Sequence, residues 1–236
     1  MSLDQNIPPM QIDSDPLDHP HVSPAVIRRL PRYFRYLREL IRQGKMRVSS
    51  GELSEMMNVT ASQIRQDLNC FGGFGQQGYG YNVKYLYSKI SELLGVSAGL
   101  CAIVVGAGNL GRALVSSHMF ERRGVTRMAL FDVDASLIGR EISGLLVHSV
   151  EHLESYCEQS KPDIAVLTTP KEAAYEVAVR LAKSGIRGIW NFSNMELRLE
   201  EYPEVIIQNI HLGDSLMTLC YEIVSSGEPS HARNGK

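Results

Sequence analysis

The sequence LCAIVVGAGNLG, residues 100–111, carries the strongest structural signal in this chain. Its first six residues, Leu100–Val105, form a continuous apolar run, which is typical of a parallel strand buried on both faces. The run leads directly into the pattern G-x-G-x-x-G and then into a helical pattern. Such glycines allow a tight turn, a close approach to a pyrophosphate group and close packing of helix on strand. The stretch predicts an α/β Rossmann domain with a doubly wound parallel sheet.

A second predicted strand supplies a carboxylate for the same site. Met128–Phe131 is apolar and ends at Asp132, about 20 residues after Gly111, where an acidic residue binds the adenosine ribose. The negative charge of Asp132 repels a 2′-phosphate, so we expect NAD(H) rather than NADP(H). A scaffold without a ligand, or one that binds another adenine nucleotide such as coenzyme A, remains an alternative. The expected cofactor-binding residues are Gly106, Ala107, Gly108, Asn109, Leu110, Gly111, Asp132, Thr169 and Pro170.

The α/β alternation continues to the C-terminal region. Thr169 and Pro170 follow a predicted strand, at the end where ligands bind in parallel sheets. Further strands and a helix are predicted at Ile164–Leu167, Ala173–Lys183, Gly188–Phe192 and Val205–Ile210. A last helix from Gly213 could pack on the sheet or embrace a second subunit. We therefore expect a Rossmann domain over 96–212, a dimerisation helix over 213–226 and a tail over 227–236.

Composition excludes several classes of protein. The chain has 236 residues, of which 44% are hydrophobic, so it can form a packed core. Its longest apolar run has six residues, whereas a membrane-spanning helix needs about 20. No basic secretory signal opens the sequence, so we expect a cytoplasmic protein. The four cysteines are widely scattered without ligand spacing, so we expect neither a metal site nor a disulfide framework.

The net charge of −2 conceals an uneven distribution. Residues 1–22 hold four Asp and no Lys or Arg, and we interpret them as a flexible acidic leader. Residues 23–95 hold eleven basic and five acidic residues. A compact basic segment is a plausible footprint for nucleic acid, although an Arg-rich helix face exposed to water gives the same count.

Residues 23–95 have the pattern of a winged helix-turn-helix domain. Ser23 can cap a helix that Pro24 begins, and Pro31 predicts a kink or a later start. The apolar face of this helix contains Ile27, Leu30, Phe34, Leu37 and Ile41. Two capping boxes follow, at Ser49–Glu52 and at Thr60–Gln63, and each opens a short helix. Helices of this size and spacing form the unit that places a recognition helix in a major groove.

A wing is predicted after the second short helix. Residues 72–81 contain five glycines with aromatic residues between them, which favours a tight β-hairpin close to a DNA backbone. Asn82 can cap a further helix that ends at Gly95. Polar and basic side chains of this domain can reach phosphates or base edges. The expected DNA-binding residues are Arg47, Ser50, Thr60, Ser62, Gln63, Arg65, Gln66, Gln77 and Tyr79.

No residues form a recognisable catalytic constellation. A dehydrogenase needs an acid–base group beside the nicotinamide and a substrate pocket. Histidines are present at His118, His148, His152 and His211, but no separate substrate domain remains after the sheet is assembled. Cys70 follows the recognition helix, where a packing role is favoured over a reactive thiol. We expect a protein that is not an enzyme.

Taken together, these modules resemble the Rex family of redox-sensing transcriptional repressors. The similarity covers residues 24–225 and rests on two unrelated modules in the same order. The matching stretches are Arg29-Leu30 with Tyr33-Phe34-Arg35, Val48-Ser49-Ser50, Val59-Thr60, Gln63–Leu68, Phe71-Gly72, Gly78–Tyr81, Gly106–Gly111, Phe131–Asp134, Thr169-Pro170 and Asn191-Phe192.

The resemblance implies a mechanism and a partner. It implies a homodimer with swapped C-terminal helices, in which each winged helix reads half of an AT-rich palindromic operator in double-stranded DNA. NADH binding to the Rossmann domain then releases the repressor from DNA. The resemblance also places a switch at Arg35, Ser117 and His211, and the family favours Tyr and an acidic residue where this chain has Ser117 and His211.

The sequence departs from the family pattern elsewhere too. Gln76-Gln77 replaces a basic pair in the wing, and Gln66 replaces Lys or Arg in the recognition helix. Cys70 and Ser193-Asn194 also differ from the usual residues. Two alternative functions therefore stay open: a divergent paralogue that responds to another ligand, and an NAD-dependent oxidoreductase with an appended DNA-binding domain.

Overall fold

The computed structural model describes residues 22–70, 75–76 and 80–226. The chain divides into two compact units, an N-terminal unit of Met1–Leu94 and a C-terminal unit of Gly95–Lys236. The division falls between Leu94 and Gly95, before the strand that leads into the glycine motif.

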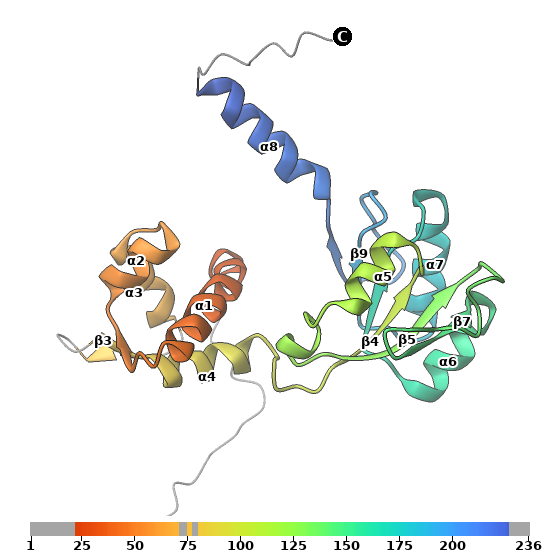
Figure 1. Ribbon diagram of the computed structural model, residues 1–236, viewed down its shortest axis with the longest axis horizontal. Helices are drawn as coiled ribbons and strands as arrows, with labels where there is room; N and C mark the ends of the chain where they lie inside the picture. Colours follow the sequence, from red (N-terminus) through yellow and green to blue (C-terminus); the bar gives the residue numbers. More distant parts are fainter. Residues whose placement is uncertain (1–21, 71–74, 77–79, 227–236) are drawn as a thin grey trace, which may run out of the picture. The chain divides into compact units, whose positions relative to one another are not determined.

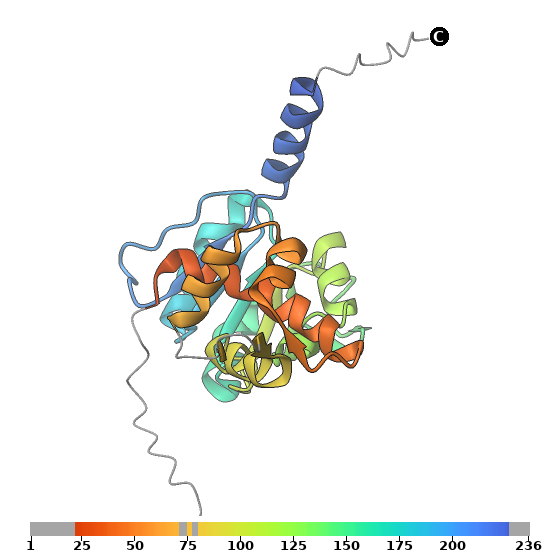
Figure 2. The ribbon, with the colours of Figure 1, turned by 90° about the vertical axis from the view of Figure 1, so that its left-hand side faces the viewer.

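In its described residues, the N-terminal unit has four helices and a small antiparallel sheet. The ribbon of this unit is drawn in Figures 1 and 2. Strand β3 lies in the middle of this sheet and pairs with β1 and β2. This arrangement agrees with the predicted winged helix-turn-helix fold. Of the predicted wing, only residues 75–76 and 80–81 lie within the described part of the chain. Its elements are α1 (Pro24–Arg42), β1 (Arg47–Val48), α2 (Ser50–Met57), α3 (Ala61–Asn69), β2 (Gly75–Gln76), β3 (Gly80–Asn82) and α4 (Val83–Leu93).

Helix α1 begins at Pro24 and continues through Pro31, so the predicted later start near Pro31 is wrong. Proline removes the hydrogen bond to the carbonyl four residues earlier, which belongs to Ile27. Both Pro31 and Ile27 are exposed, so water can bind that carbonyl. The opposite face of α1 is buried, and Phe34 stacks on Tyr87 of α4 with ring centroids 4.9 Å apart. Burial of this face outweighs the cost of the proline.

The two predicted capping boxes differ in the structure. At the start of α2, Ser49 and Glu52 each bind the other's backbone N–H, which confirms the first box. At the start of α3, the Thr60 hydroxyl accepts a hydrogen bond from the backbone N–H of Gln63. The Gln63 side chain donates to Asp67 instead of reaching back to Thr60, so the second box is only half formed.

The C-terminal unit has a seven-stranded sheet in the order β10-β9-β8-β4-β5-β7-β6. All neighbours are parallel except β6 and β7, which form a hairpin. The strand order reverses between β4 and β8, which is the doubly wound Rossmann topology predicted from the sequence. The strands are β4 (Cys101–Val105), β5 (Thr126–Asp132), β6 (Glu141–Ile142), β7 (Leu145–Ser149), β8 (Ile164–Leu167), β9 (Gly188–Asn191) and β10 (Ile206–Asn209).

Two hydrophobic cores cover the two faces of this sheet. On one face, Ile103 and Val105 of β4 pack with residues of α6 (Leu153–Ser160) and α7 (Lys171–Lys183). On the other face, Ala102 and Val104 of β4 pack with α5 (Asn109–Ser116). Successive side chains of a strand point to opposite faces, so the apolar run of β4 contributes to both cores. Two short 3-10 helices, Glu121–Arg123 and Val150–His152, complete the unit.

The last helix, α8 (Leu212–Ser225), exposes all of its side chains. Its large apolar residues include Leu216, Met217, Leu219 and Ile223, at 51% to 72% exposure. Among the residues that the structure describes, no helix combines the length and apolar character needed to cross a bilayer.

Candidate functional site

The turn between β4 and α5 requires two of its three motif glycines. Gly106 has φ +107°, and a Cβ there would lie 2.7 Å from the backbone oxygen of Thr168. A Cβ at Gly111 would overlap the backbone oxygen of Gly106. By contrast, Gly108 has φ −69°, and a Cβ added there would meet no atom within 4 Å. The packing of the turn explains Gly106 and Gly111, whereas the space beside Gly108 is open.

Asp132 lies at the end of β5 and faces this turn. Its Oδ2 accepts the backbone N–H of Ala107, and its Oδ1 accepts the N–H of Asp134 at 2.9 Å. The carboxylate is half-buried, so its remaining lone pairs can accept hydrogen bonds from a ribose. The sequence prediction that Asp132 joins the glycine turn is consistent with this geometry.

The end of β8 completes the same edge of the sheet. Thr168 donates its hydroxyl to the Gly106 carbonyl at 2.7 Å and thereby fixes the turn. Thr169 has a buried Oγ1 that makes no hydrogen bond to any described residue. Pro170 follows as the exposed N-cap of α7. A buried, unpaired hydroxyl at the strand-order reversal fits a polar ligand.

Helix α5 adds a favourable site for an anion. It begins after Gly108 with Asn109, Leu110 and Gly111, and its first turn contains no acidic residue. The free N–H groups and the positive dipole end of such a helix bind phosphate groups. The predicted cofactor residues therefore meet at the carboxyl ends of β4, β5 and β8.

The candidate DNA-binding residues lie on α3 and beside it. Ser62, Arg65 and Gln66 are exposed on α3, and Thr60 is its exposed N-cap. The Arg65 guanidinium donates to the hydroxyls of Ser62, at 3.2 Å, and of Ser50, at 3.1 Å. Arg47 is exposed on β1, whereas Gln77 and Tyr79 lie outside the described residues.

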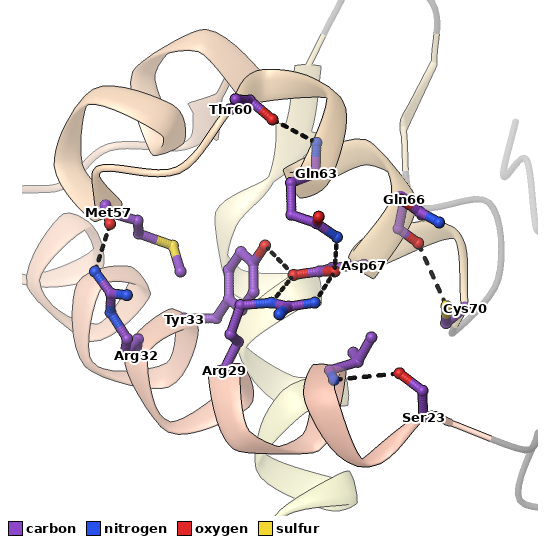
Figure 3. A network of polar contacts seen from close by, with 11 residues as sticks. Ser23, Arg29, Arg32, Tyr33, Met57, Thr60, Gln63, Gln66, Asp67 and Cys70 are labelled. Carbon is purple, nitrogen blue, oxygen red and sulfur yellow. Dashed lines mark hydrogen bonds and ion pairs between the residues drawn. The ribbon is translucent and has the colours of Figure 1, made fainter.

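A buried carboxylate anchors α3 to α1 (Figure 3). Asp67 has 0% exposure, and Arg29 donates to both of its oxygens at 2.7 Å. The Tyr33 hydroxyl also donates to Asp67 at 3.0 Å, and the Gln63 amide at 2.8 Å. We call these four residues the Asp67 network. Sequence reasoning missed it, although an acidic residue on the apolar face of α3 was a signal that a partner had to be near.

The network also sets the protonation of Asp67. Burial by itself raises the pKa of this carboxyl, but hydrogen bonds from Arg29, Gln63 and Tyr33 outweigh burial and hold the pKa below its ordinary value. Burial and the Asp67 charge raise the pKa of Tyr33, which therefore stays a neutral donor. Asp67 is thus a buried anion with donors on both oxygens, and it holds α3 at a fixed position on α1.

The three switch candidates have separate local contacts. The Arg35 guanidinium lies 5.2 Å from the ring centroid of Tyr36. Ser117 ends α5 and donates to the Leu114 carbonyl at 2.8 Å. His211 precedes α8, and its Nε2 lies 3.1 Å from a carboxylate oxygen of Glu196. Glu196 was not predicted to take part.

Other reactive residue types have ordinary surroundings. His148 packs against Phe131 and Tyr156, and burial lowers its pKa, as does the nearby His152. The Cys70 thiol donates to the Gln66 carbonyl, with 3.3 Å between sulfur and oxygen. Within the described part of the chain, no group of three or more His, Cys, Asp or Glu is arranged to hold a metal ion.

Comparison with known proteins identifies both modules. Residues 21–69 match the family described as "Putative DNA-binding protein N-terminus", and residues 98–195 match "CoA binding domain". A redox-sensing transcriptional repressor Rex of Thermoanaerobacter sp. (strain X514) is 49% identical over 86% of this chain and 89% of its own. The Rex of Caldanaerobacter subterraneus subsp. tengcongensis is 50% identical over the same shares. The chain belongs to the Rex family. The two relatives of this family described above are transcriptional repressors rather than enzymes.

Solved Rex structures agree with the fold. RSP, a Rex-family repressor, has been solved in complex with beta-NAD+ and operator DNA. That structure is 48% identical, has a TM-score of 0.82, and is matched over 87% of this chain and 94% of its own. RSP in complex with beta-NADH is 45% identical, with a TM-score of 0.80 and coverage of 87% and 96%.

Serine substitutions should distinguish the two kinds of glycine in the turn. Gly111→Ser places a side chain against the Gly106 carbonyl and should lower the free energy of unfolding by about 2 kcal/mol or more. Gly108→Ser meets open space and should change it by less than about 0.5 kcal/mol. Urea unfolding of both variants tests this, and equal losses would contradict the assignment of Gly108 to a ligand.

Acidification should weaken the N-terminal unit through Asp67. Because the folded pKa lies below the ordinary 3.8, the carboxylate stabilises the fold above that pH and loses its effect as pH falls through the folded pKa. An apolar triple variant (Arg29→Met, Tyr33→Phe, Asp67→Leu) removes this dependence, and apolar replacement of a buried ion pair is often tolerated. Urea unfolding between pH 6 and pH 2 (roughly the carboxyl range) should show wild type losing stability relative to the variant. Parallel pH profiles would refute the role of Asp67.

Proposed function

We propose that this protein is a redox-sensing repressor that holds operator DNA and releases it when NADH binds. The observation that carries the proposal is that one chain joins a recognition helix to a dinucleotide turn, and matches RSP across both. RSP itself has been solved with operator DNA and NAD+, and with NADH. No catalytic role is proposed for any residue.

The dinucleotide is NAD(H), held at the end of the parallel sheet. Asp132 takes the ribose hydroxyls of the adenosine, and its charge disfavours a 2′-phosphate. The backbone beside Gly108 and the first turn of α5 take the pyrophosphate. The Thr169 hydroxyl, buried and without a partner among described residues, supplies a polar contact to the bound molecule. The signal is the oxidation state of the nicotinamide, which differs between NAD+ and NADH. The protein senses this state and transfers no hydride.

The DNA site is the exposed side of α3 with its flanks. Arg47 and Arg65 provide positive charge for phosphates, whereas Gln63 and Gln66 offer amides to base edges. Ser50, Ser62 and Thr60 contribute hydroxyls near the backbone, and the predicted wing contacts Gln77 and Tyr79 complete the site.

A homodimer is the expected assembly. Every side chain of α8 is exposed, including several large apolar ones, and such a helix is stabilised by a partner surface. We propose that the helices are exchanged between two copies, so that two recognition helices read the halves of an AT-rich palindrome. The same proposal assigns DNA binding to a winged-helix domain over 23–95 and NAD(H) binding to a Rossmann domain over 96–212. It also places the protein in the cytoplasm.

Release of DNA requires unequal affinities. NADH shifts the dimer only if it binds the DNA-free arrangement more tightly than the DNA-bound one. Arg35, Ser117 and His211 are the proposed switch residues. The family favours an acidic residue at position 211, where this chain has His211. Here the carboxylate near the start of α8 is that of Glu196, which contacts His211.

Another adenine nucleotide is the alternative ligand. The match of residues 98–195 to a family described as "CoA binding domain" favours keeping coenzyme A in the test. An oxidoreductase is disfavoured because the similar Rex proteins are repressors.

An operator titration tests the proposal directly. At one fixed salt concentration, NADH should weaken operator binding. NAD+ and coenzyme A should leave most of the operator binding intact. Gly108→Val fills the pyrophosphate space and should abolish the NADH response while DNA binding persists. Ala113→Val, on the exposed side of α5, is the matched control and should respond as wild type does. An undiminished response of Gly108→Val would refute the pocket.

The Arg65 contact predicts a salt effect. Arg65→Ala should weaken operator binding and reduce the slope of log affinity against log salt by about 0.9, which is one phosphate contact. Arg187→Ala removes the same charge from an exposed site of the C-terminal unit and should leave the slope unchanged. The measurement is fluorescence anisotropy across a salt series, and identical slopes for wild type and Arg65→Ala would remove Arg65 from the interface.

A further inference from the structure

The Asp67 network fixes which way the Gln63 amide faces. An ionised carboxylate only accepts hydrogen bonds, so the group that Gln63 turns toward Asp67 must be its NH2, at 2.8 Å. Asp67 cannot rotate to accommodate the opposite orientation, because Arg29 binds both of its oxygens and Tyr33 binds one. The orientation of the amide therefore follows from the buried pair (Figure 3).

The main chain of Gln63 is fixed as well. Its N–H donates to the Thr60 hydroxyl at 3.2 Å, which caps α3. Gln63 is the third residue of α3 and is half-buried, next to exposed Ser62. In helix-turn-helix proteins, the N-terminal residues of the recognition helix contact base edges. Both the backbone and the amide of Gln63 are thus set before any DNA arrives.

The part of the amide that Asp67 leaves free has one acceptor and one donor. The Oε1 has its lone pairs, and Nε2 has one remaining N–H. Adenine presents the complementary pair in the major groove, with N7 as acceptor and the N6 amine as donor. Guanine presents two acceptors, N7 and O6, so one of them would face Oε1. Cytosine and thymine each offer a single polar group.

We propose that Gln63 reads an adenine in each operator half-site and that Asp67, which touches no DNA, is the positioning residue that sets this preference. Without the carboxylate, the amide can turn over and offer its NH2 group to guanine, so discrimination falls. This inference rests on the proposed function, since it assumes that α3 enters the major groove.

Selection from a randomised duplex library tests the proposal. Full-length wild type, Gln63→Ala and the apolar triple variant are each used at low salt, where phosphate contacts sustain binding. Wild type should prefer adenine over guanine at one position of each half-site by roughly 5- to 150-fold, the range of a good bidentate pair. Gln63→Ala should lose the preference there and keep it at all other positions.

The triple variant provides the second readout. Folded as judged by its thermal transition, it should show a reduced preference at the Gln63 position alone. The control Asn69→Ala removes an exposed amide from the far end of α3 and should keep that preference. Unchanged selection by Gln63→Ala, or a full adenine preference in the triple variant, would overturn the inference while wild-type binding upholds the proposed function. Failure of wild type to select any duplex would overturn the proposed function, and this inference with it.

Discussion

The C-terminal unit depends on the close approach of backbone to backbone where β4 turns into α5. Gly111 lies against the Gly106 carbonyl, and Gly106 lies against Thr168, so neither position has room for a side chain. The Thr168 hydroxyl holds the Gly106 carbonyl from β8. Because of this contact, α5 begins at the carboxyl edge of the sheet, and Asp132 and Thr169 lie at the ends of the two strands that flank β4. The proposed ligand site is a consequence of how tightly the turn is packed.

The N-terminal unit depends on a polar contact of comparable importance. Asp67 is a buried anion, and a buried charge is costly unless it is paired and hydrogen-bonded. Arg29, Tyr33 and Gln63 supply those bonds, and they come from α1 as well as from α3. A carboxylate of this kind does little for stability compared with an apolar core, but it restricts α3 to one position and one orientation. That restriction is useful for a helix that must match a groove.

The sequence predicted regular features better than individual side chains. The apolar run of β4 and the glycines after it led to the correct sheet class because burial and turn geometry repeat in such domains. Strands β6 and β7 of the seven-stranded sheet were not predicted. The later helix start at Pro31 was wrong because a single sequence does not show that the proline lies on the exposed face of α1. Gln63 fitted a capping-box pattern, and only the position of Asp67 on the packed helix shows that its amide has another partner. Contacts between distant residues, such as Arg29 with Asp67 and His211 with Glu196, follow from tertiary packing.

The central claim is that nucleotide occupancy and DNA affinity are coupled within one protein. Coupling between two ligands is reciprocal, so DNA must weaken NADH binding by the same factor by which NADH weakens DNA binding. The most direct measurement is calorimetric titration of NADH into the protein alone and into the protein saturated with operator DNA. The account predicts weaker NADH binding in the presence of DNA, by a factor equal to that found in the converse titration. Equal NADH affinity with and without DNA would contradict it.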